Sequence, residues 1–307
     1  MLMGQLDLRE RFQGCIRGEV LIEEPLSLHT YFRIGGPAEV MVYPAGLEDV
    51  KAVLKVARDE TIPVLILGSG SNMLALDGGF RGLVMNLSQT FLELEVSGEQ
   101  IRCGAGVRTS RLLALSAMRS LTGLEGLTGV PGTVGGAIKG NAGTSLSAIV
   151  DHLDWIRLVD CLGEERYLAR AEIDAGYRHC ILPTGSVIVE ACFTLRRAEA
   201  EEIRGTISAL LVRRNLTQPV EIRSAGCIFK NPSGDFAGRL VEHAGLKGLR
   251  RGGAQISEKH GNFIVNLGGA TAAEVLWLIE RARAEVMVKT GVALELEIQV
   301  VGSPIAG

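Results

Sequence analysis

Two glycine-dense stretches constrain this chain more than any other feature of its sequence. The first, Gly68-Ser69-Gly70-Ser71-Asn72, directly follows a short apolar run at residues 63–67. The second lies at residues 129–137 and contains four glycines and a proline. Glycine loses more conformational entropy on folding than any other residue, so such density indicates backbone that must approach another group closely. The whole chain has 39 glycines in 307 residues, and a turn-rich fold would account for that total equally well.

The first stretch has the composition of an anion-binding turn. Successive backbone N–H groups can converge on a phosphate, and the serine and asparagine side chains add donors. No Lys-Ser or Lys-Thr follows, which excludes a Walker A loop, and the GxGxxG of a Rossmann fingerprint is missing. Taken alone, the stretch also fits an ordinary structural turn. Two such loops in one chain favour a long, phosphate-bearing ligand held at two places.

Hydrophobic periodicity predicts a mixed α/β chain in three parts. Helices are expected at residues 47–57, 109–121, 199–214, 236–244 and 272–289. Strands are expected at 38–43, 63–67, 83–87, 153–158, 187–195, 262–267 and 294–301, with a hairpin at 91–103. Residues 215–223, which include Gln218-Pro219, are expected to form a linker into the third part.

Composition excludes several classes of function. The net charge of −3 provides no basic surface for nucleic acid or for a membrane. The longest apolar runs are far too short to span a bilayer, and the first residues do not form a signal peptide. The six cysteines form no CxxC pair and no metal cluster, which fits free thiols in a reducing cytoplasm. We therefore expect a cytoplasmic protein with no metal and no obligatory protein partner.

Motifs in a fixed order make the chain similar to one known family. They lie at residues 30–38, 68–72, 129–143 (GVPGTVGGAIKGNAG), 176–178, 224–232 (SAGCIFKNP), 252–257, 260–266 and 294–302. Together they resemble the UDP-N-acetylenolpyruvoylglucosamine reductase (MurB) family, in particular its shorter, type II-like members. The resemblance extends over nearly the whole chain.

The resemblance implies both a fold and a reaction. The fold would be mixed α/β (α+β), with an oxidase-type (PCMH/VAO-like) two-part FAD-binding domain at residues 1–85 and 86–197. A C-terminal α/β substrate-binding domain would occupy residues 198–307. The implied reaction is the NADPH-dependent, FAD-mediated reduction of UDP-N-acetylglucosamine enolpyruvate to UDP-N-acetylmuramate. This step of peptidoglycan precursor synthesis supports cell-wall biogenesis, cell shape and cell division. FAD would be bound non-covalently, and NADPH would be a co-substrate.

Three residues match the catalytic positions of the family. Arg178 would hold the substrate carboxylate and stabilise the enolate, as a bidentate guanidinium can. Cys227 would be the proton donor, because a thiol with an ordinary pKa of about 8.5 is protonated at neutral pH yet can release its proton. Glu297 would help to stabilise or protonate the enol intermediate. Strand periodicity alone does not separate Glu297 from Glu295, and each of the three could instead be an ordinary structural or surface residue.

Further residues are assigned to ligands by the same resemblance. The expected FAD contacts are Arg33, Gly68, Ser69, Gly70, Ser71, Asn72, Gly129, Pro131, Gly132, Gly135, Gly136 and Asn141. The expected contacts with the UDP-sugar substrate are Tyr177, Arg214, Lys230, Asn231 and His260. A solvated basic residue is at least as good an explanation for Arg214.

The chain also departs from the family pattern. Cys180 stands where serine is common, and Leu296 and Gln299 replace the proline and arginine of the usual final motif. These departures affect detailed contacts and leave the reaction class intact. Two other functions remain open: another oxidase-type FAD oxidoreductase, and a nucleotide-binding module without catalysis.

Overall fold

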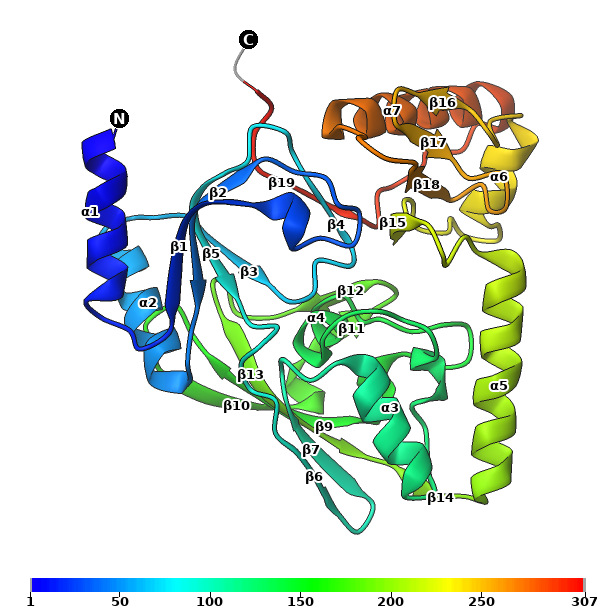
Figure 1. The fold of residues 1–307 in the computed structure, drawn as a ribbon. Coiled ribbons are helices and arrows are strands. Elements are labelled where there is room, and N and C mark those ends of the chain that lie inside the picture. Colours follow the sequence, from blue (N-terminus) through cyan, green and yellow to red (C-terminus); the bar gives the residue numbers. More distant parts are fainter. Residues whose placement is uncertain (1, 306–307) are drawn as a thin grey trace. The chain divides into compact units, whose positions relative to one another are not determined.

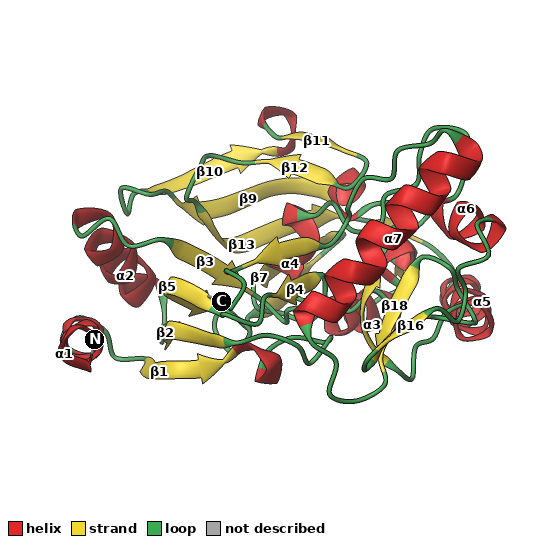
Figure 2. Cartoon of the chain, turned by 90° about the horizontal axis from the view of Figure 1, so that it is seen from above, coloured by secondary structure: helices red, strands yellow, loops and turns green. Residues whose placement is uncertain are grey.

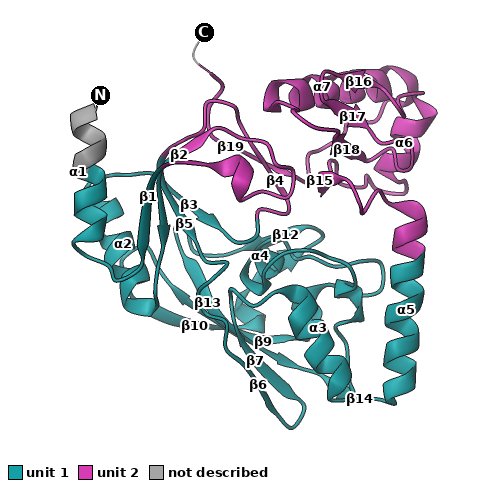
Figure 3. Ribbon diagram, in the orientation of Figure 1, with its two compact units in different colours: residues 1–22, 39–69, 82–212 teal, residues 23–38, 70–81, 213–307 magenta. Residues whose placement is uncertain are grey.

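The computed structural model describes residues 2–305, with side chains from residue 8 onward. The chain divides into two compact units (Figure 3). Unit 1 comprises residues 1–22, 39–69 and 82–212, and unit 2 comprises residues 23–38, 70–81 and 213–307. Two short segments of the expected first FAD-binding subdomain therefore belong to unit 2. The expected domain boundaries near residues 85 and 197 stay predictions.

The first sheet has the strand order β1-β2-β5-β3 and lies mostly in unit 1 (Figure 1). Its strands are β1 (Glu19–Pro25), β2 (Pro37–Tyr43), β5 (Phe80–Asn86) and β3 (Val64–Leu67). The last two are parallel. Helix α2 (Leu47–Asp59) packs Val50, Val53 and Leu54 against this sheet, since these apolar residues recur at helical spacing. The N-terminal helix α1 is Leu2–Gln13.

The second sheet of unit 1 has the order β10-β9-β13-β7-β6 and is antiparallel (Figure 2). Its strands are β10 (Glu165–Ala169), β9 (Leu153–Val159), β13 (Val187–Thr194), β7 (Gln100–Gly104) and β6 (Leu94–Ser97). Helices α3 (Thr109–Met118) and α4 (Val134–Lys139) share one buried cluster with it. The small pairs are β11 (Asp174–Gly176) with β12 (His179–Ile181), and β8 (Leu121–Thr122) with β14 (Arg196–Arg197).

Unit 2 is built on the antiparallel sheet β15-β18-β17-β16. Its strands are β15 (Arg223–Cys227), β18 (Phe263–Asn266), β17 (Ala254–Ile256) and β16 (Arg250–Arg251). Helices α6 (Ala237–His243) and α7 (Ala272–Thr290) share a buried cluster with these strands. A separate parallel pair joins β4 (Met73–Ala75) to β19 (Gln299–Val301). Helix α5 (Ala200–Thr217) carries the chain from unit 1 into unit 2.

Short 3-10 helices complete the described elements, at Leu26–Leu28, Glu125–Leu127, Ile149–His152 and Arg170–Glu172. Within residues 2–305, no helix combines the length and the apolar character that crossing a membrane requires. The same residues contain no group of three or more His, Cys, Asp or Glu placed to hold a metal ion.

The mixed α/β class is confirmed, and every long periodic helix lies close to its expected position. The linker expected at 215–223 begins later, because α5 continues to Thr217. The final strand expected at 294–301 is regular only from Gln299, and before that Leu296 makes a single bridge to Phe229. Neither β1 nor α4 was expected. Four residues of α4 lie within the second glycine stretch, where local preference is against a helix.

Candidate active site

The two glycine loops meet within unit 1. A Cβ atom added to Gly68 would lie only 2.4 Å from Thr133 Oγ1. That hydroxyl caps α4 by accepting a hydrogen bond from the Gly136 N–H at 3.4 Å. A side chain at Gly68 would therefore collide with the residue that begins α4. The close approach explains the glycine and places the start of the first loop beside the second.

Buried polar atoms in these loops are left without protein partners. Ser69 Oγ, Thr128 Oγ1 and Asn141 Oδ1 are buried and have no hydrogen-bond partner among the described residues. A buried polar atom without a partner costs about 1–3 kcal/mol, so such atoms usually meet a ligand or water. The loops thus fit a bound phosphate-bearing cofactor such as FAD. Thr128 was missed in the sequence, although its position directly before Gly129 was a usable signal.

Arg178 lies in the two-residue turn between β11 and β12, where Gly176 pairs with His179. Its backbone is left-handed, with φ of 59°, which is uncommon outside glycine. The guanidinium donates from Nη2 to the Gly143 carbonyl at 2.9 Å and from Nη1 to the Asn141 carbonyl at 3.5 Å. It also lies 5.2 Å from the centre of the exposed Tyr177 ring. The arginine is therefore directed toward the second glycine loop of unit 1.

In unit 2, the rest of the first glycine loop packs against the segment around Arg33. The Tyr31 N–H donates to the Gly70 carbonyl at 3.1 Å, and a Cβ on Gly70 would strike the His29 carbonyl oxygen at 2.3 Å. Arg33 is exposed, has a left-handed φ of 56°, and donates to the Leu28 carbonyl at 2.7 Å. Two motifs 40 residues apart in the sequence therefore form one surface of unit 2.

Backbone pairing places the segments that contain Cys227 and Glu297 side by side in unit 2. The Glu297 N–H donates to the Ile228 carbonyl at 2.8 Å, and the Lys230 N–H donates to the Glu295 carbonyl at 2.8 Å. With the antiparallel bridge between Phe229 and Leu296, these bonds align residues 228–230 with 295–297. Cys227 therefore lies one position beyond the residue that pairs with Glu297. Both side chains are half-buried.

The first glycine loop also contacts the segment around Glu297. Asn72 Nδ2 donates to the Glu297 carbonyl at 3.0 Å, and the Gln299 N–H donates to the Asn72 carbonyl at 3.0 Å. Asn72 was expected as a cofactor contact. In the structure, the Asn72 side chain fixes the backbone of Glu297, a predicted catalytic residue.

The expected substrate residues of unit 2 are used in different ways. Lys230 lies 3.6 Å from the Glu295 carboxylate, and Asn231 Oδ1 accepts the Ala237 N–H at the start of α6. Burial lowers the pKa of the Arg214 guanidinium, and the nearby Cys227 sulfur acts in the opposite direction. Arg214 is thus a half-buried cation beside the predicted acid rather than a fully solvated one.

His260 is integrated into the scaffold. Its Nδ1 accepts the Asn262 N–H at 3.2 Å, and its ring lies edge-on to Phe263 with centroids 4.9 Å apart. Burial lowers the pKa of His260, with a further contribution from Lys247. The ring therefore favours the neutral form, and its role as a substrate contact stays a prediction.

The three departures from the family pattern occupy unlike environments. Cys180 is buried, burial raises its thiol pKa, and its carbonyl accepts a hydrogen bond from Lys139 Nζ at 3.4 Å. Leu296 packs against the core of unit 2, and Gln299 is exposed where β19 pairs with β4. None of the three adds a charge to the site.

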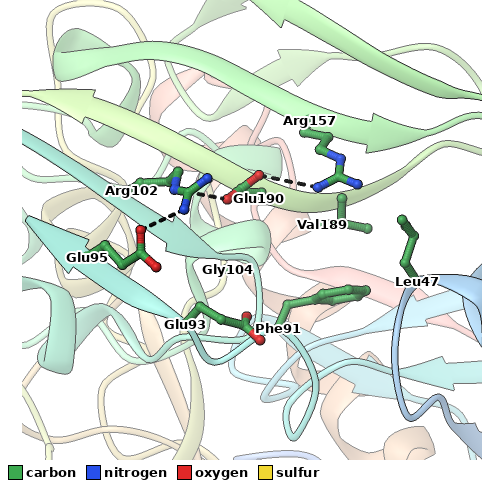
Figure 4. A pocket seen from close by; sticks show the side chains of 9 residues that line it. All are labelled: Leu47, Phe91, Glu93, Glu95, Arg102, Gly104, Arg157, Val189 and Glu190. Carbon is green, nitrogen blue, oxygen red and sulfur yellow. Dashed lines mark hydrogen bonds and ion pairs between the residues drawn. The ribbon is translucent and has the colours of Figure 1, made fainter.

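A cavity of about 240 Å³ in unit 1 lies apart from all these residues (Figure 4). Arg102 forms ion pairs with Glu95 at 2.6 Å and with Glu190 at 3.5 Å, and Arg157 lies 3.6 Å from Glu190. The cavity is smaller than the roughly 300–1,000 Å³ of typical ligand pockets, and these charges already pair with one another. A second cavity, of about 460 Å³ in unit 2, is lined by Asn215, Pro219, Val220, Glu221, Ile222, Gln255, Ser257, Glu258, Lys259 and Val265. Neither cavity includes a predicted catalytic residue in its lining.

Comparisons with known proteins cover the same regions. Residues 38–168 match the FAD binding domain family, and residues 218–301 match the C-terminal domain family of UDP-N-acetylenolpyruvoylglucosamine reductase. The reductase of Anaeromyxobacter sp. is 42% identical over 97% of this chain and 94% of its own length. That of Moorella thermoacetica is 42% identical over 96% of this chain and 97% of its own length.

A solved structure agrees with these relatives. The UDP-N-acetylenolpyruvylglucosamine reductase (MurB) from Thermus caldophilus aligns with a TM-score of 0.79 and 38% identity. The alignment covers 93% of this chain and 99% of the other. The expected fold, an oxidase-type FAD-binding domain with a C-terminal α/β domain, is therefore confirmed. This chain belongs to the UDP-N-acetylenolpyruvoylglucosamine reductase family.

Proposed function

We propose that this chain is a UDP-N-acetylmuramate dehydrogenase, which reduces UDP-N-acetylglucosamine enolpyruvate with NADPH and non-covalent FAD. The observation that carries the proposal is the antiparallel pairing of residues 228–230 with 295–297, which places the segments that contain Cys227 and Glu297 side by side. A simple nucleotide-binding module has no use for a thiol and a carboxylate in this arrangement. Family membership supplies the reaction in which both have roles.

The glycine loops of unit 1 fit the FAD that this reaction needs. Ser69 and Thr128 present buried hydroxyls. The close approach of Gly68 to Thr133 holds the backbones of the two loops near each other. When bound, FAD supplies hydride transfer from NADPH to the enolpyruvyl β-carbon. The protein contributes position, charge and a proton.

Arg178 would stabilise the negative charge that develops on the substrate carboxylate. Its guanidinium is permanently charged and already oriented by the Gly143 carbonyl. A donor fixed before the reaction needs no reorganisation when charge develops, which is the main advantage of such groups in catalysis. Tyr177, stacked beside it and exposed, is available to the substrate.

Cys227 would deliver the proton to the α-carbon. A thiol is a far stronger acid than a serine hydroxyl, and the half-buried Arg214 beside it would favour the thiolate left behind. Glu297, fixed through its backbone on both sides, would stabilise the intermediate or share the proton transfer. Lys230 and Asn231 would meet the diphosphate or the uracil.

The proposed product is a precursor of peptidoglycan, which connects the chain to cell-wall biogenesis, cell shape and cell division. None of the six cysteines, all of which lie in the described part of the chain, forms a disulfide bond. Free thiols suit the reducing cytoplasm, where we place the reaction.

The test is anaerobic spectroscopy of the purified protein. NADPH is expected to bleach the visible flavin bands, and UDP-N-acetylglucosamine enolpyruvate is expected to restore them without oxygen. UDP-N-acetylglucosamine, which lacks the enolpyruvyl group, is the control and should leave the flavin reduced. Bands that return only in air would instead identify an oxidase, and a protein without flavin would indicate a binding module.

A further inference from the structure

Asn141 lies at the centre of the contacts that hold Arg178. Its Nδ2 donates to the Gly176 carbonyl at 2.8 Å, two residues before the arginine. Its own carbonyl, together with that of Gly143, accepts the hydrogen bonds of the guanidinium. One residue therefore fixes the backbone at the start of the Arg178 turn and helps to orient the arginine side chain.

Backbone conformation makes these contacts important. Asn141 and Arg178 are both left-handed, with φ of 41° and 59°. A non-glycine residue in this region costs of order 1–2 kcal/mol and persists only when surrounding contacts hold it. Because Asn141 is only 5% exposed, water competes little for the hydrogen bond that its side-chain amide donates to the Gly176 carbonyl.

We propose that Asn141 is a positioning residue, which acts on catalysis by holding the Arg178 turn in its left-handed conformation. The proposal rests on the proposed function, because it needs Arg178 to act on the substrate. It changes the expected role of Asn141, which the sequence assigned to FAD. The side-chain Nδ2 donates one of its two N–H groups to the Gly176 carbonyl, so Oδ1 and the second N–H remain for a cofactor.

The two roles predict different kinetics. A cofactor contact would weaken FAD binding or alter reduction of the flavin by NADPH. A positioning residue would slow only the reoxidation of reduced flavin by the enolpyruvyl substrate. Because that effect passes through Arg178, it should disappear in a protein that already lacks the guanidinium.

The experiment is a double-mutant cycle of Asn141→Gly and Arg178→Ala, followed by anaerobic stopped-flow spectroscopy. Glycine keeps the left-handed backbone without strain and removes only the amide. Arg178→Ala is expected to slow reoxidation by about 10²–10³-fold, as loss of a charge-stabilising donor does. Asn141→Gly is expected to slow it by about 10–100-fold, as loss of an orienting partner does. Flavin reduction by NADPH should stay unchanged.

The double variant decides the assignment. If the double variant reoxidises no more slowly than Arg178→Ala alone, the result supports the positioning role. If the slowing in the double variant equals the product of the slowing in the two single variants, the positioning role is wrong. Weaker FAD binding with normal reoxidation would restore the cofactor role. If Arg178→Ala reoxidises normally, the assumed role of Arg178 is wrong and the inference falls with it, although turnover would still support the reductase.

Two further variants exclude a loss of folding as the cause. Asn141→Asp retains the shape but cannot donate to the Gly176 carbonyl, so it should share the slow reoxidation. Thr90→Ala is the matched control, because it removes another buried hydrogen bond to a carbonyl in unit 1, that of Pro44 at 2.6 Å. Thr90→Ala should reoxidise at the wild-type rate. If its reoxidation slowed as much as that of Asn141→Gly, the cause would be general destabilisation and the positioning role would be wrong.

Discussion

At the scale of single residues, the proposed role of Cys227 as the proton donor can be tested by substitution. We expect Cys227→Ala to bind FAD and to be reduced by NADPH normally, but to reoxidise with substrate about 10²–10⁴-fold more slowly, since its acid is lost. Cys227→Ser should be intermediate, because a hydroxyl can donate a proton less readily than a thiol. Stopped-flow spectroscopy of each half-reaction measures both variants. The exposed Cys161 provides the control, Cys161→Ala, and normal turnover by Cys227→Ala would reject the assignment.

Residue identity suggests candidate ligand residues, but it does not say which contacts their side chains make within the protein. Asn72, Asn141 and Asn231 were assigned to ligands, yet each also makes a hydrogen bond to the protein backbone. An asparagine amide carries both donors and an acceptor, so composition alone cannot say which of them the protein itself uses. Their ligand contacts stay predictions.

At the scale of elements, the N-terminus of α7 shows how a distant residue can complete a helix. Asp77, from the loop after β4, accepts the N–H groups of Ala272 and Ala273 at 2.8 and 2.9 Å. Thr271 and Glu274 add a capping box at the same end. The capping box follows the local sequence pattern Thr-x-x-Glu, whereas Asp77 is distant in the sequence and has no local signal.

Replacing Asp77 therefore tests a tertiary cap. Asp77→Ala is expected to lower the free energy of unfolding by about 1–2 kcal/mol, the upper part of the range for helix caps, because two amides lose their acceptors. Urea denaturation followed by circular dichroism measures the change. Asp59→Ala, at the exposed end of α2, is the control and should change stability little. An equal loss in both variants would contradict the capping role.

The long helices were predictable, whereas most strands of two or three residues were not. In α2 and α7, apolar residues recur at helical spacing over three or more turns, and this signal is local. Strands of two or three residues, such as β4 and β16, carry too little pattern to be recognised and exist only because a partner strand lies beside them. Pairing between distant segments is a tertiary property.

At the scale of the whole molecule, two half-buried histidines predict how stability depends on pH. Burial is the main cause that lowers the pKa of His152 and of His260. Between the lowered pKa and about 6.5, the unfolded chain binds more protons than the folded one, so stability rises with pH in that window. The lowered pKa values of Asp160, Glu165 and Asp235, the last at about 2, act only at lower pH.

We therefore expect the midpoint of thermal unfolding to fall as the pH is lowered from about 7 to about 5. A His152→Gln/His260→Gln double variant should show a flatter profile over the same range. Differential scanning calorimetry of both proteins, saturated with FAD, measures the difference. Parallel profiles would mean that other groups control this pH window.

The sequence by itself determined the reaction class of this protein, because that class depends on residue types and motif order. The glycine loops, Arg178, Cys227 and Glu297 were all named as candidates without coordinates, and their roles stay predictions. The tertiary structure alone decided how they are held. The Gln299 N–H pairs with the carbonyl of the distant Asn72, and the register beside Cys227 depends on the isolated bridge between Phe229 and Leu296. Hydrogen bonds between distant backbone groups leave no periodic trace in a sequence, because any residue supplies the same N–H and C=O groups.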